Sequence, residues 1–346
     1  MLKNRLQKIR HTSHKIVALL LVISFLTVFH YGEAYKGEGD GTAVSGNGTG
    51  YVCNFLLLGV DSTERLTDVI MLVSLNSTSR SLSVAQIPRD TYAEYTDAAY
   101  RKLNGAYSTL GGGREVADFL EKILGITIDH YIVLDLEVLS ETVDAVGGVE
   151  ITVPEDMTYF DEAQGLSIDL KAGNQLLDGD KAVQFIRYRA GYVRGDIARL
   201  DAQKIFLSAF FERLASCPKP KLITVAQKLI ANSKNDISLE DCFDIISNAI
   251  KIEEKNIIFF TMPGADVRTD GGAWYYVINK KETVEMLERC FGGSGKISET
   301  DSGRALTGVY SKEFNAIYDA ESGYECKIYT AESINSGGIE IDKIKQ

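Results

Sequence analysis

Histidine is scarce in this 346-residue sequence, and its scarcity narrows the chemistry that the chain supports. Three of the four histidines, His11, His14 and His30, lie at or before the end of an apolar N-terminal run. Only His130 lies in the body of the chain. A histidine-rich metal site and a mechanism that uses two histidines are therefore excluded.

Cysteine is sparse as well, and no two cysteines have the spacing of a CxxC pair. A zinc ribbon and a thioredoxin-like motif are therefore absent. An odd, scattered set is not a disulfide framework, although an extracytoplasmic domain leaves room for one bridge. Burial as small hydrophobic side chains is the simpler interpretation. The five residues are Cys53, Cys217, Cys242, Cys290 and Cys326.

Motifs that bind nucleotides or activate a serine are also missing. The sequence has no GxxxxGK[ST] loop and no GxSxG elbow, and the glycines at 111–113 lack the spacing of a dinucleotide fingerprint. The net charge of −11 argues against general nucleic-acid binding, so we expect no nucleic-acid partner. With 45% apolar and 25% charged residues, the composition is that of a folded protein.

The N-terminus carries a basic head, residues 1–15, followed by the apolar run IVALLLVISFLTVFHY at 16–31. This run is slightly shorter than the about 20 residues that cross a bilayer. The cationic flank predicts a cytoplasmic N-terminus and an extracytoplasmic body, in a single-pass protein of the cell membrane. A cleaved signal peptide is the alternative, but no small-x-small site stands out, which favours a retained signal-anchor. The glycine-rich residues 32–50 predict a flexible linker.

From residue 51 onward, strand-like and helix-like segments alternate, which predicts a layered α/β or α+β domain with a covered sheet. The polar turn between the second and third strands predicts a hairpin. Residues 292–346 are polar, with an apolar-spaced piece near 327–344, and form a C-terminal extension without an assigned role. The predicted strands are residues 54–60, 68–75, 81–88, 128–135, 148–154, 256–263 and 274–278. The predicted helices are residues 115–125, 136–148, 179–189, 196–216, 219–232, 238–250 and 279–291.

Two acidic residues flank the first predicted strand connection. Asp61 follows one strand and Asp68 begins the next. Loops at strand ends often hold functional residues, because a rigid sheet fixes their positions. If the chain brings the two carboxylates together, they could hold Mg²⁺ through their oxygens. The alternative, which spacing alone favours, is that both acids cap a surface turn.

Arginines form two further clusters. Arg89 stands in IPRD (87–90) at a strand end, where a lone Arg–Asp pair is normally a weak surface ion pair. The segment RYRAGYVRGDIARLDAQ (187–203) holds four arginines in an acidic protein, and converging guanidinium groups bind phosphate oxygens. A solvated basic stripe is the alternative. Asp196 has the position of a helix N-cap, and Arg199 and Gln203 share one helix face.

These clusters, in this order, resemble the LytR–CpsA–Psr family over about residues 51–291. The short cationic head and single anchor fit the topology of that family. The matching blocks are NFLLLGVDS (54–62), TDVIMLVSLN (67–76), IPRDTY (87–92), KLNGAY (102–107), LGITIDHYIVLD (124–135), VDAVGGVEITVPEDM (143–157), AVQFIRYR (182–189), GDIARLDAQK (195–204), and MPG with GGAWYYVI (262–278).

The resemblance implies a mixed central β-sheet flanked by helices, with an apolar pocket for a polyprenyl chain. It also implies transfer of a glycopolymer from polyprenyl-pyrophosphate to peptidoglycan or another cell-envelope acceptor. Asp61 and Asp68 match the positions of Mg²⁺ ligands. Arg89 matches the catalytic arginine of the IPRD motif. The residues that match the basic cluster facing the pyrophosphate are Arg187, Arg189 and Arg199.

The remaining site residues are assigned as follows. Asp90 or Asp196 would act as the general base, and the residues do not decide between them. Phe206, Leu207, Phe210 and Phe211 would line the lipid pocket, although an apolar helical stripe is more often plain core. The expected substrate-binding residues are Arg65, Lys102, Asn104, Arg194, Gln203, Phe206 and Phe210.

The sequence departs from the family pattern at several positions. The loop between Asp61 and Asp68 is short, and Val69 stands where the family usually has threonine. Ala198 and Ala202 stand where many members have glycine and arginine, so one phosphate contact is missing unless Arg194 replaces it. Two alternatives therefore stay open: a binding module that holds the lipid pyrophosphate without turnover, and a lipid pyrophosphatase that uses water as the acceptor.

Overall fold

The computed structural model describes most of the chain from residue 51 onward, and the predicted anchor and linker lie outside the described residues. No helix within the described part is both long enough and apolar enough to cross a bilayer. The described residues are 51–61, 63–95, 101–162, 165–218, 221, 225, 232–238, 241, 244–245, 248, 251–293, 312–321, 324 and 326–341.

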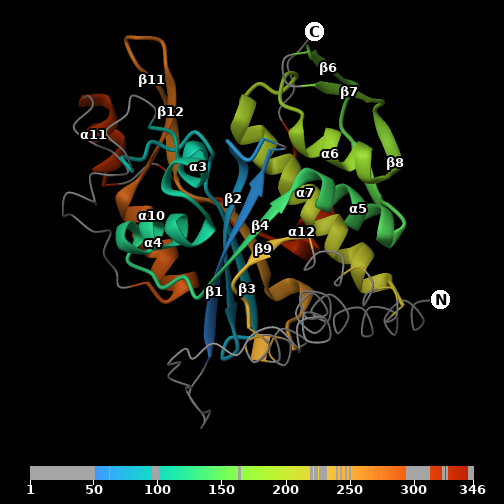
Figure 1. Ribbon diagram of the computed structural model, residues 1–346, viewed down its shortest axis with the longest axis horizontal. Coiled ribbons are helices and arrows are strands. Elements are labelled where there is room, and N and C mark those ends of the chain that lie inside the picture. Colours follow the sequence, from blue (N-terminus) through green and yellow to red (C-terminus); the bar gives the residue numbers. More distant parts are fainter. Residues whose placement is uncertain are drawn as a thin grey trace.

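A seven-stranded mixed sheet forms the centre of the fold, in the order β13-β10-β3-β2-β1-β4-β9 (Figure 1). β1, β2 and β3 run antiparallel, while β1 pairs with β4 and β3 with β10 in parallel. The predicted hairpin and the mixed central sheet are thus confirmed. The bounds are β1 Val52–Val60, β2 Thr67–Asn76, β3 Ser81–Gln86, β4 His130–Asp135, β9 Lys234–Asn235, β10 Ile257–Thr261 and β13 Tyr329–Thr330.

Apolar side chains on both faces explain why this sheet is covered on both sides. On β1, Leu56 and Leu58 belong to one core cluster, while Phe55 belongs to another and Leu57, between the two leucines, packs against that second cluster. Successive residues of a strand point to opposite faces, so the continuous apolar run of β1 supplies two cores. β2, β3 and β10 divide their residues between the two clusters in the same way.

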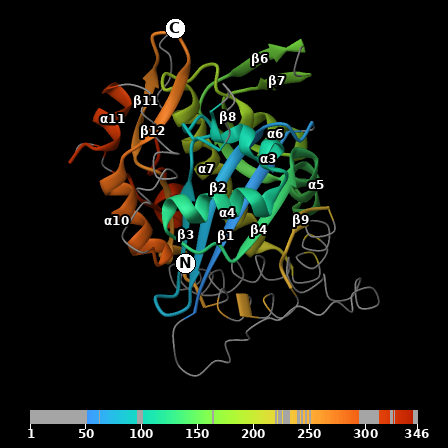
Figure 2. The same ribbon diagram turned by 60° about the vertical axis from the view of Figure 1, so that its left-hand side comes forward.

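Helices and a hairpin cover the first face of the sheet. Figure 2 shows α4 crossing in front of the strands, with α10 and α11 to one side. α4 ends where Gly125 takes a left-handed conformation, as its sequence predicted. Phe314 of α11 is fully buried and packs against Tyr92 and Tyr275. The elements are η1 Leu103–Gly105, α3 Ala106–Leu110, α4 Gly113–Leu124, β11 Gly264–Arg268, β12 Trp274–Ile278, α10 Lys280–Phe291 and α11 Lys312–Tyr318.

The long helix α7 lies on the other side of the sheet, where two short antiparallel pairs, β5–β8 and β6–β7, enclose a further core with it (Figure 1). α12 packs on α7, and Ser208 of α7 donates a hydrogen bond to the carbonyl of Ala331 at 3.1 Å. The elements are α5 Leu136–Val146, β5 Val149–Val153, β6 Met157–Asp161, β7 Leu166–Leu170, β8 Gly173–Leu177, α6 Gly179–Arg187, α7 Gly195–Ser216, η3 Glu254–Asn256 and α12 Ala331–Asn335.

Most predicted elements form, and the misses are short. All seven predicted strands are present, and so are the predicted helices that correspond to α4, α5, α6, α7 and α10. The helices predicted at 219–232 and 238–250 lie largely outside the described residues. β6, β7, β8 and β11 were not predicted, because strands of five residues resemble loops in sequence. The two-residue strands β9 and β13 and the short helices α3, α11 and α12 were not predicted either. Among the described cysteines, four are free and three of those are buried.

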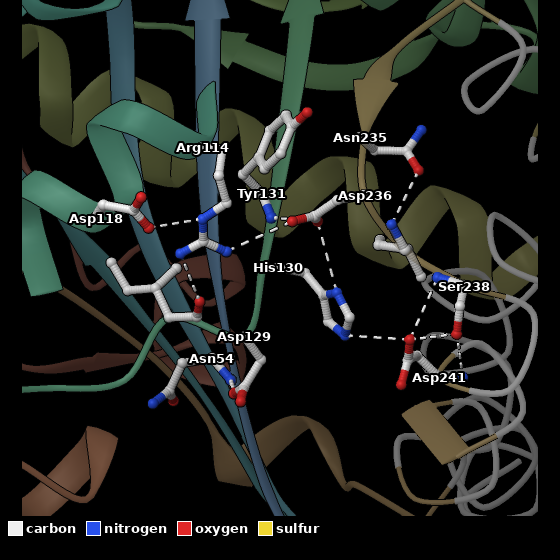
Figure 3. A network of polar contacts seen from close by, with 12 residues as sticks. Asn54, Arg114, Asp118, Asp129, His130, Tyr131, Asn235, Asp236, Ser238 and Asp241 are labelled. Carbon is white, nitrogen blue, oxygen red and sulfur yellow. Dashed lines mark hydrogen bonds and ion pairs between the residues drawn. The ribbon is translucent and has the colours of Figure 1, made fainter. Parts of the chain in front are cut away.

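The only histidine of the body has a structural position at the sheet edge (Figure 3). Asp236, directly after β9, accepts a hydrogen bond from the backbone N–H of Tyr131 at 2.9 Å and lies 3.5 Å from His130 Nδ1. Arg114 of α4 reaches the same carboxylate at 3.5 Å. The imidazole of His130 is directed between Asp236 and Asp241, so these contacts hold β9 against β4.

A β-bulge interrupts the pairing of β1 and β2. Gly59 faces Val69 and Val60 faces Thr67, which leaves Asp68 as one extra residue on β2. Such a bulge turns a side chain away from the regular alternation of the strand. A Cβ atom at position 59 would lie 2.8 Å from Cβ of Val69, so only glycine fits beside the bulge. The bulge therefore sets the direction of the Asp68 side chain.

We expect Gly59→Ala to lower the free energy of unfolding by about 1–3 kcal/mol, because the new methyl group overlaps Val69. Urea unfolding measures this change. Gly271→Ala is the matched control, since its Cβ would meet only Thr269 Oγ1, at 3.9 Å. Equal stability losses in the two variants would contradict the close approach of β1 and β2.

Candidate active site

An open pocket lies where β2, the turn after β3, the start of α7 and the β6–β7 hairpin meet. Its volume is about 380 Å³, including the solvent at its mouth. Four arginines and one aspartate supply its charged lining, and two residues of the hairpin supply the rest. The lining residues are Asp68, Arg89, Tyr159, Leu166, Arg187, Arg189 and Arg199.

Two carboxylates and two guanidinium groups form an ion cluster in the wall of this pocket. Arg89 Nη1 lies 2.5 Å from Asp68 Oδ1, and Arg89 Nε lies 3.2 Å from Asp196 Oδ1. Arg199 bridges the same two acids, at 3.7 Å from Asp68 Oδ1 and 2.9 Å from Asp196 Oδ1. Each arginine thus contacts both acids, and the cluster joins β2, the turn after β3 and α7.

Local structure places the two acids of this cluster. The bulge directs Asp68, and Asp196 lies in the first turn of α7, where the helix dipole favours a negative charge. The prediction that Asp196 caps this helix is wrong, because the helix begins at Gly195 and Arg194 is the N-cap, without a side-chain cap bond. Glycine at 195, with φ of 47°, lets the chain turn into the helix one residue earlier than predicted.

Burial and ion pairing act on these charges in opposite directions. Burial alone would raise the pKa of Asp68, but Arg199 and Arg89 outweigh it and hold that pKa below its ordinary value. Asp196 and Asp68 similarly outweigh the effect of burial on Arg89 and raise its pKa. The side chain of Arg199 is only 2% exposed, and its burial lowers its pKa.

Several polar atoms of the cluster lack a well-aligned partner. Nε of Arg89, Nε of Arg199 and both carboxylate oxygens of Asp196 are buried without a hydrogen bond among the described residues. The Arg–Asp196 contacts lie within ion-pair distance, but their geometry is not that of a hydrogen bond. Buried polar groups normally have hydrogen-bond partners. Arginine donors without a partner at a pocket therefore indicate a place where a ligand can bind.

Arg187 and Arg189 make the pocket cationic. α6 ends at Arg187, and the chain continues extended through Tyr188, so both arginines line the pocket on the way to α7. The ion cluster is balanced by its own two acids, which leaves these two positive charges without an ion-pair partner among the described residues. Several guanidinium groups around one open pocket suit a ligand with adjacent phosphates.

Asp61 does not line the pocket. Its Oδ1 accepts hydrogen bonds from the N–H and hydroxyl of Thr63 and from the N–H of Arg65. This is the turn-capping role that the sequence offered as the alternative to a metal ligand. The Arg65 side chain is exposed on that turn.

The turn that carries Arg89 is supported by three predicted site residues, Asp90, Lys102 and Asn104. Lys102 Nζ pairs with Asp90 Oδ1 at 3.1 Å. Asn104 is buried, and its backbone N–H donates to the carbonyl of Arg89 at 3.0 Å. These residues support the turn that carries Arg89, and none of them lines the pocket.

The other predicted substrate-binding residues lie along α7, away from the pocket lining. Arg194 pairs with Asp201 at 2.9 Å. Gln203 is buried and bonds to Gln86 and to the carbonyl of Ile186, each at 3.4 Å. Phe206 and Phe210 stack at 5.7 Å within the core that α7 shares with the short strands.

The departures at positions 198 and 202 also fall in that core. Ala198 and Ala202 are fully buried among its apolar side chains. An arginine at 202 would start from this core rather than from the pocket wall. Neither alanine belongs to the lining of the pocket.

Three residues of the site region were not predicted. Tyr159 and Leu166 come from the unpredicted β6–β7 hairpin and form the wall beside the arginines. The carboxylate of Asp266, on β11, interacts electrostatically with Asp196 and Asp90. Desolvation of its carboxyl, together with these neighbours, raises the pKa of Asp266 from 3.8 to about 6. No motif in the sequence signals this pairing of β11 with the site.

Comparisons with known proteins agree on one family. A model described as the LytR_cpsA_psr family matches residues 24–291. The polyisoprenyl-teichoic acid–peptidoglycan teichoic acid transferase TagV of Bacillus subtilis (strain 168) is 29% identical over 231 residues, which cover 64% of this chain and 58% of TagV. The corresponding transferase TagU of Bacillus cereus (strain AH820) is 31% identical over 233 residues, or 65% of this chain and 73% of TagU.

The fold agrees with the same group. The crystal structure of TagV from B. subtilis superposes with a TM-score of 0.57 at 23% identity, and the match covers 69% of this chain and 95% of that one. The sequence match spans less than two thirds of the length of TagV.

Removing the buried guanidinium of the ion cluster should destabilise the protein. Arg199→Met leaves Asp68 and Asp196 with Arg89 as their one cluster partner, and we expect a loss of about 3 kcal/mol in the free energy of unfolding. Urea unfolding at neutral pH measures it. Arg289→Met, at an exposed position of α10, is the control. If both variants lose the same stability, the cluster does not hold the three segments together.

Asp266→Asn should stabilise the protein at neutral pH. Because the folded state binds the Asp266 proton more tightly than the unfolded chain, wild-type stability falls as the pH rises from 3.8 to about 6. The amide removes this cost, so the Tm gain of the variant should be full above about pH 6 and absent below 3.8. Thermal unfolding across this range tests it, and a gain independent of pH would contradict the assignment.

Proposed function

This chain belongs to the LytR_cpsA_psr family, and on that basis we propose that it transfers a glycopolymer from a polyprenyl-pyrophosphate carrier to peptidoglycan or another cell-envelope acceptor. TagV and TagU, its relatives, are named as transferases that join teichoic acid to peptidoglycan. The observation that carries the proposal is the pocket with four arginines and a single lining carboxylate.

A pyrophosphate is the group that suits this wall. Phosphoryl transfer needs positioning and neutralisation of charge more than covalent help from the protein. Arg187 and Arg189 supply the charge that the cluster does not balance, while Arg89 and Arg199 are held in place by Asp68 and Asp196. Donors that are fixed before the substrate arrives stabilise a transition state without reorganisation.

The reaction that we propose is a single transfer at phosphorus. The oxygen of an acceptor hydroxyl attacks the sugar-bearing phosphorus and forms a new P–O bond. The bond from that phosphorus to the bridging oxygen breaks, and polyprenyl phosphate leaves. The proton of the hydroxyl passes to a carboxylate, and the product is a phosphodiester between the glycopolymer and the acceptor.

Three carboxylates are candidates for the proton acceptor. Asp196 contacts two arginines, and Asp90 is paired with Lys102. Asp266 adds a third candidate, and its pKa of about 6 is near the value that suits a general base at neutral pH. An activity profile of Asp266→Asn against pH distinguishes it from the other two.

Mg²⁺ is the cofactor that we propose, with Asp61 and Asp68 as its ligands. Asp61 and Asp68 each use Oδ1 for their contacts with described residues, which leaves both Oδ2 atoms as oxygen ligands. No group of three or more acidic, histidine or cysteine side chains in the described part forms a complete metal cage. Mg²⁺ commonly binds through one or two carboxylates plus substrate phosphates. When bound, it would neutralise charge on the pyrophosphate.

The membrane is the remaining partner in this proposal. The apolar run at 16–31 would anchor the chain beside its lipid-linked donor, with the domain outside the cytoplasm. The non-catalytic binding module stays the alternative to this proposal, because Ala198 and Ala202 stand where the family pattern has glycine and arginine.

We expect the full chain, in detergent with Mg²⁺, a polyprenyl-pyrophosphate-linked sugar and a peptidoglycan oligomer, to yield a phosphodiester-linked product by mass spectrometry. Arg89→Ala removes a guanidinium from the wall and should lower kcat/KM by about 100-fold or more, as does the loss of a transition-state donor. Asp68→Ala should act in the same direction, because Arg89 and Arg199 lose a partner that positions them.

Arg289→Ala, at an exposed position on α10, is the control and should leave kcat/KM unchanged. Tight donor binding without product across several acceptors would replace the transferase by a binding module. Release of the sugar phosphate to water in place of the acceptor would identify a lipid pyrophosphatase.

A further inference from the structure

The β11–β12 hairpin carries the single tryptophan of the chain on an open surface. Trp274 is 53% exposed, which is unusual for the largest apolar side chain. It pairs with Arg268 across the two strands, and the guanidinium lies 5.7 Å from the indole ring. A cation over one face of the ring fixes its orientation and leaves the rest of the side chain in solvent.

The register of the hairpin places a polar row beside this tryptophan. Trp274 faces Arg268, and two residues further along Tyr276 faces Asp266. Directly paired residues and residues two apart on a strand share one face of a hairpin. Trp274, Arg268, Asp266 and Tyr276 therefore lie on one face. Tyr276 is buried, and we call the exposed part of this face, Trp274 with Arg268 and Asp266, the outer hairpin face.

The edge of β12 is attached next to the active site. The N–H of Tyr276 donates to the carbonyl of Asp90 at 2.9 Å, and the N–H of Tyr92 donates to the carbonyl of Tyr276 at the same distance. Asp90 follows Arg89 of the pocket wall directly. Two residues of a strand span about 7 Å, so Trp274 stands only that far along β12 from the point of attachment.

The base of the hairpin is rigid, so this separation is fixed. Tyr275 is buried against Tyr92 and Phe314, and the Tyr276 hydroxyl donates to the carbonyl of Met262 at 2.6 Å. Figures 1 and 2 show the β11–β12 hairpin projecting from the same end of the molecule as the β6–β7 hairpin, which supplies Tyr159 and Leu166 to the pocket.

We propose that the outer hairpin face, Trp274 with Arg268 and Asp266, binds a sugar ring of the acceptor glycan and presents a neighbouring hydroxyl to the arginine pocket. The inference rests on the proposed transferase function. A sugar ring has an apolar face of C–H groups and a rim of hydroxyls. An exposed indole suits the first, and a guanidinium with a carboxylate suits the second.

A lipid surface is the other ligand that an exposed tryptophan suggests, and the hairpin tip argues against it. The loop TDGGA (269–273) between the strands contains an acidic residue and no large apolar one. An anionic lipid surface attracts basic segments, whereas this tip has none beyond Arg268, which is already placed on the indole. A membrane-inserting tip would present several apolar side chains together.

The single tryptophan makes the inference directly measurable, because all indole emission of the full chain comes from position 274. We expect a peptidoglycan tetrasaccharide to shift and quench this emission in a saturable titration, without any donor present. Anionic phospholipid vesicles should leave it unchanged. A response to vesicles and none to the tetrasaccharide would overturn the inference in favour of a membrane contact.

Kinetics with the same acceptor provide the second test. Trp274→Ala should raise the KM for the acceptor about tenfold and leave the KM for the lipid-linked donor unchanged, and Trp274→Phe should recover part of the loss. Phe160→Ala is the matched control, since Phe160 is 72% exposed on β6 and lies outside the outer hairpin face. An unchanged acceptor KM in Trp274→Ala would overturn the inference.

The two proposals can fail separately. A saturable fluorescence response in a protein that forms no transfer product supports the sugar site and contradicts the transferase. Product formation without any response of Trp274 to the tetrasaccharide contradicts the sugar site and leaves the transferase intact.

Discussion

The ion cluster of Asp68, Arg89, Asp196 and Arg199 is the interaction on which the rest of the site depends. Its members come from three segments that are far apart in sequence, and each arginine contacts both acids. Buried charges are costly alone and tolerable only when paired. The cluster therefore holds β2, the turn after β3 and α7 in one arrangement, and the same pairing keeps two guanidinium groups oriented toward the pocket.

Most strands of the central sheet and the long helices could be predicted from the sequence, because the patterns that specify them lie within a few neighbouring residues. The apolar runs of β1, β2 and β3 and the glycine that ends α4 specify their elements within a few residues. The arginines of the site were found because they lie in two short segments. The ion cluster was not, since the contact of Asp68 with Arg199 spans more than a hundred positions of sequence and depends on a bulge.

The missed parts share a physical cause. β6, β7 and β11 are five-residue strands that pair only with each other or with β12, so their patterns are too short to distinguish from loops. Tyr159, Leu166 and Asp266 come from these strands, and their place beside the arginines follows from tertiary packing alone. For Phe206 and Phe210 the residues were predicted but their role was not decided, because their helical spacing fits both a lipid pocket and a core. In the structure the two rings stack within a core.

Because β13 pairs with β10, the main sheet cannot be complete until the C-terminal part of the chain has been synthesised. A ribosome makes β10 well before β13. Phe314 of α11, which packs against both Tyr92 and Tyr275, also follows β10 in the chain. Until those residues emerge, one edge of the main sheet and part of its core stay open to proteases and to other nascent chains. A nonsense mutation just after α10 would spare every charged residue of the pocket, yet it would leave a polypeptide that quality-control systems treat as unfinished.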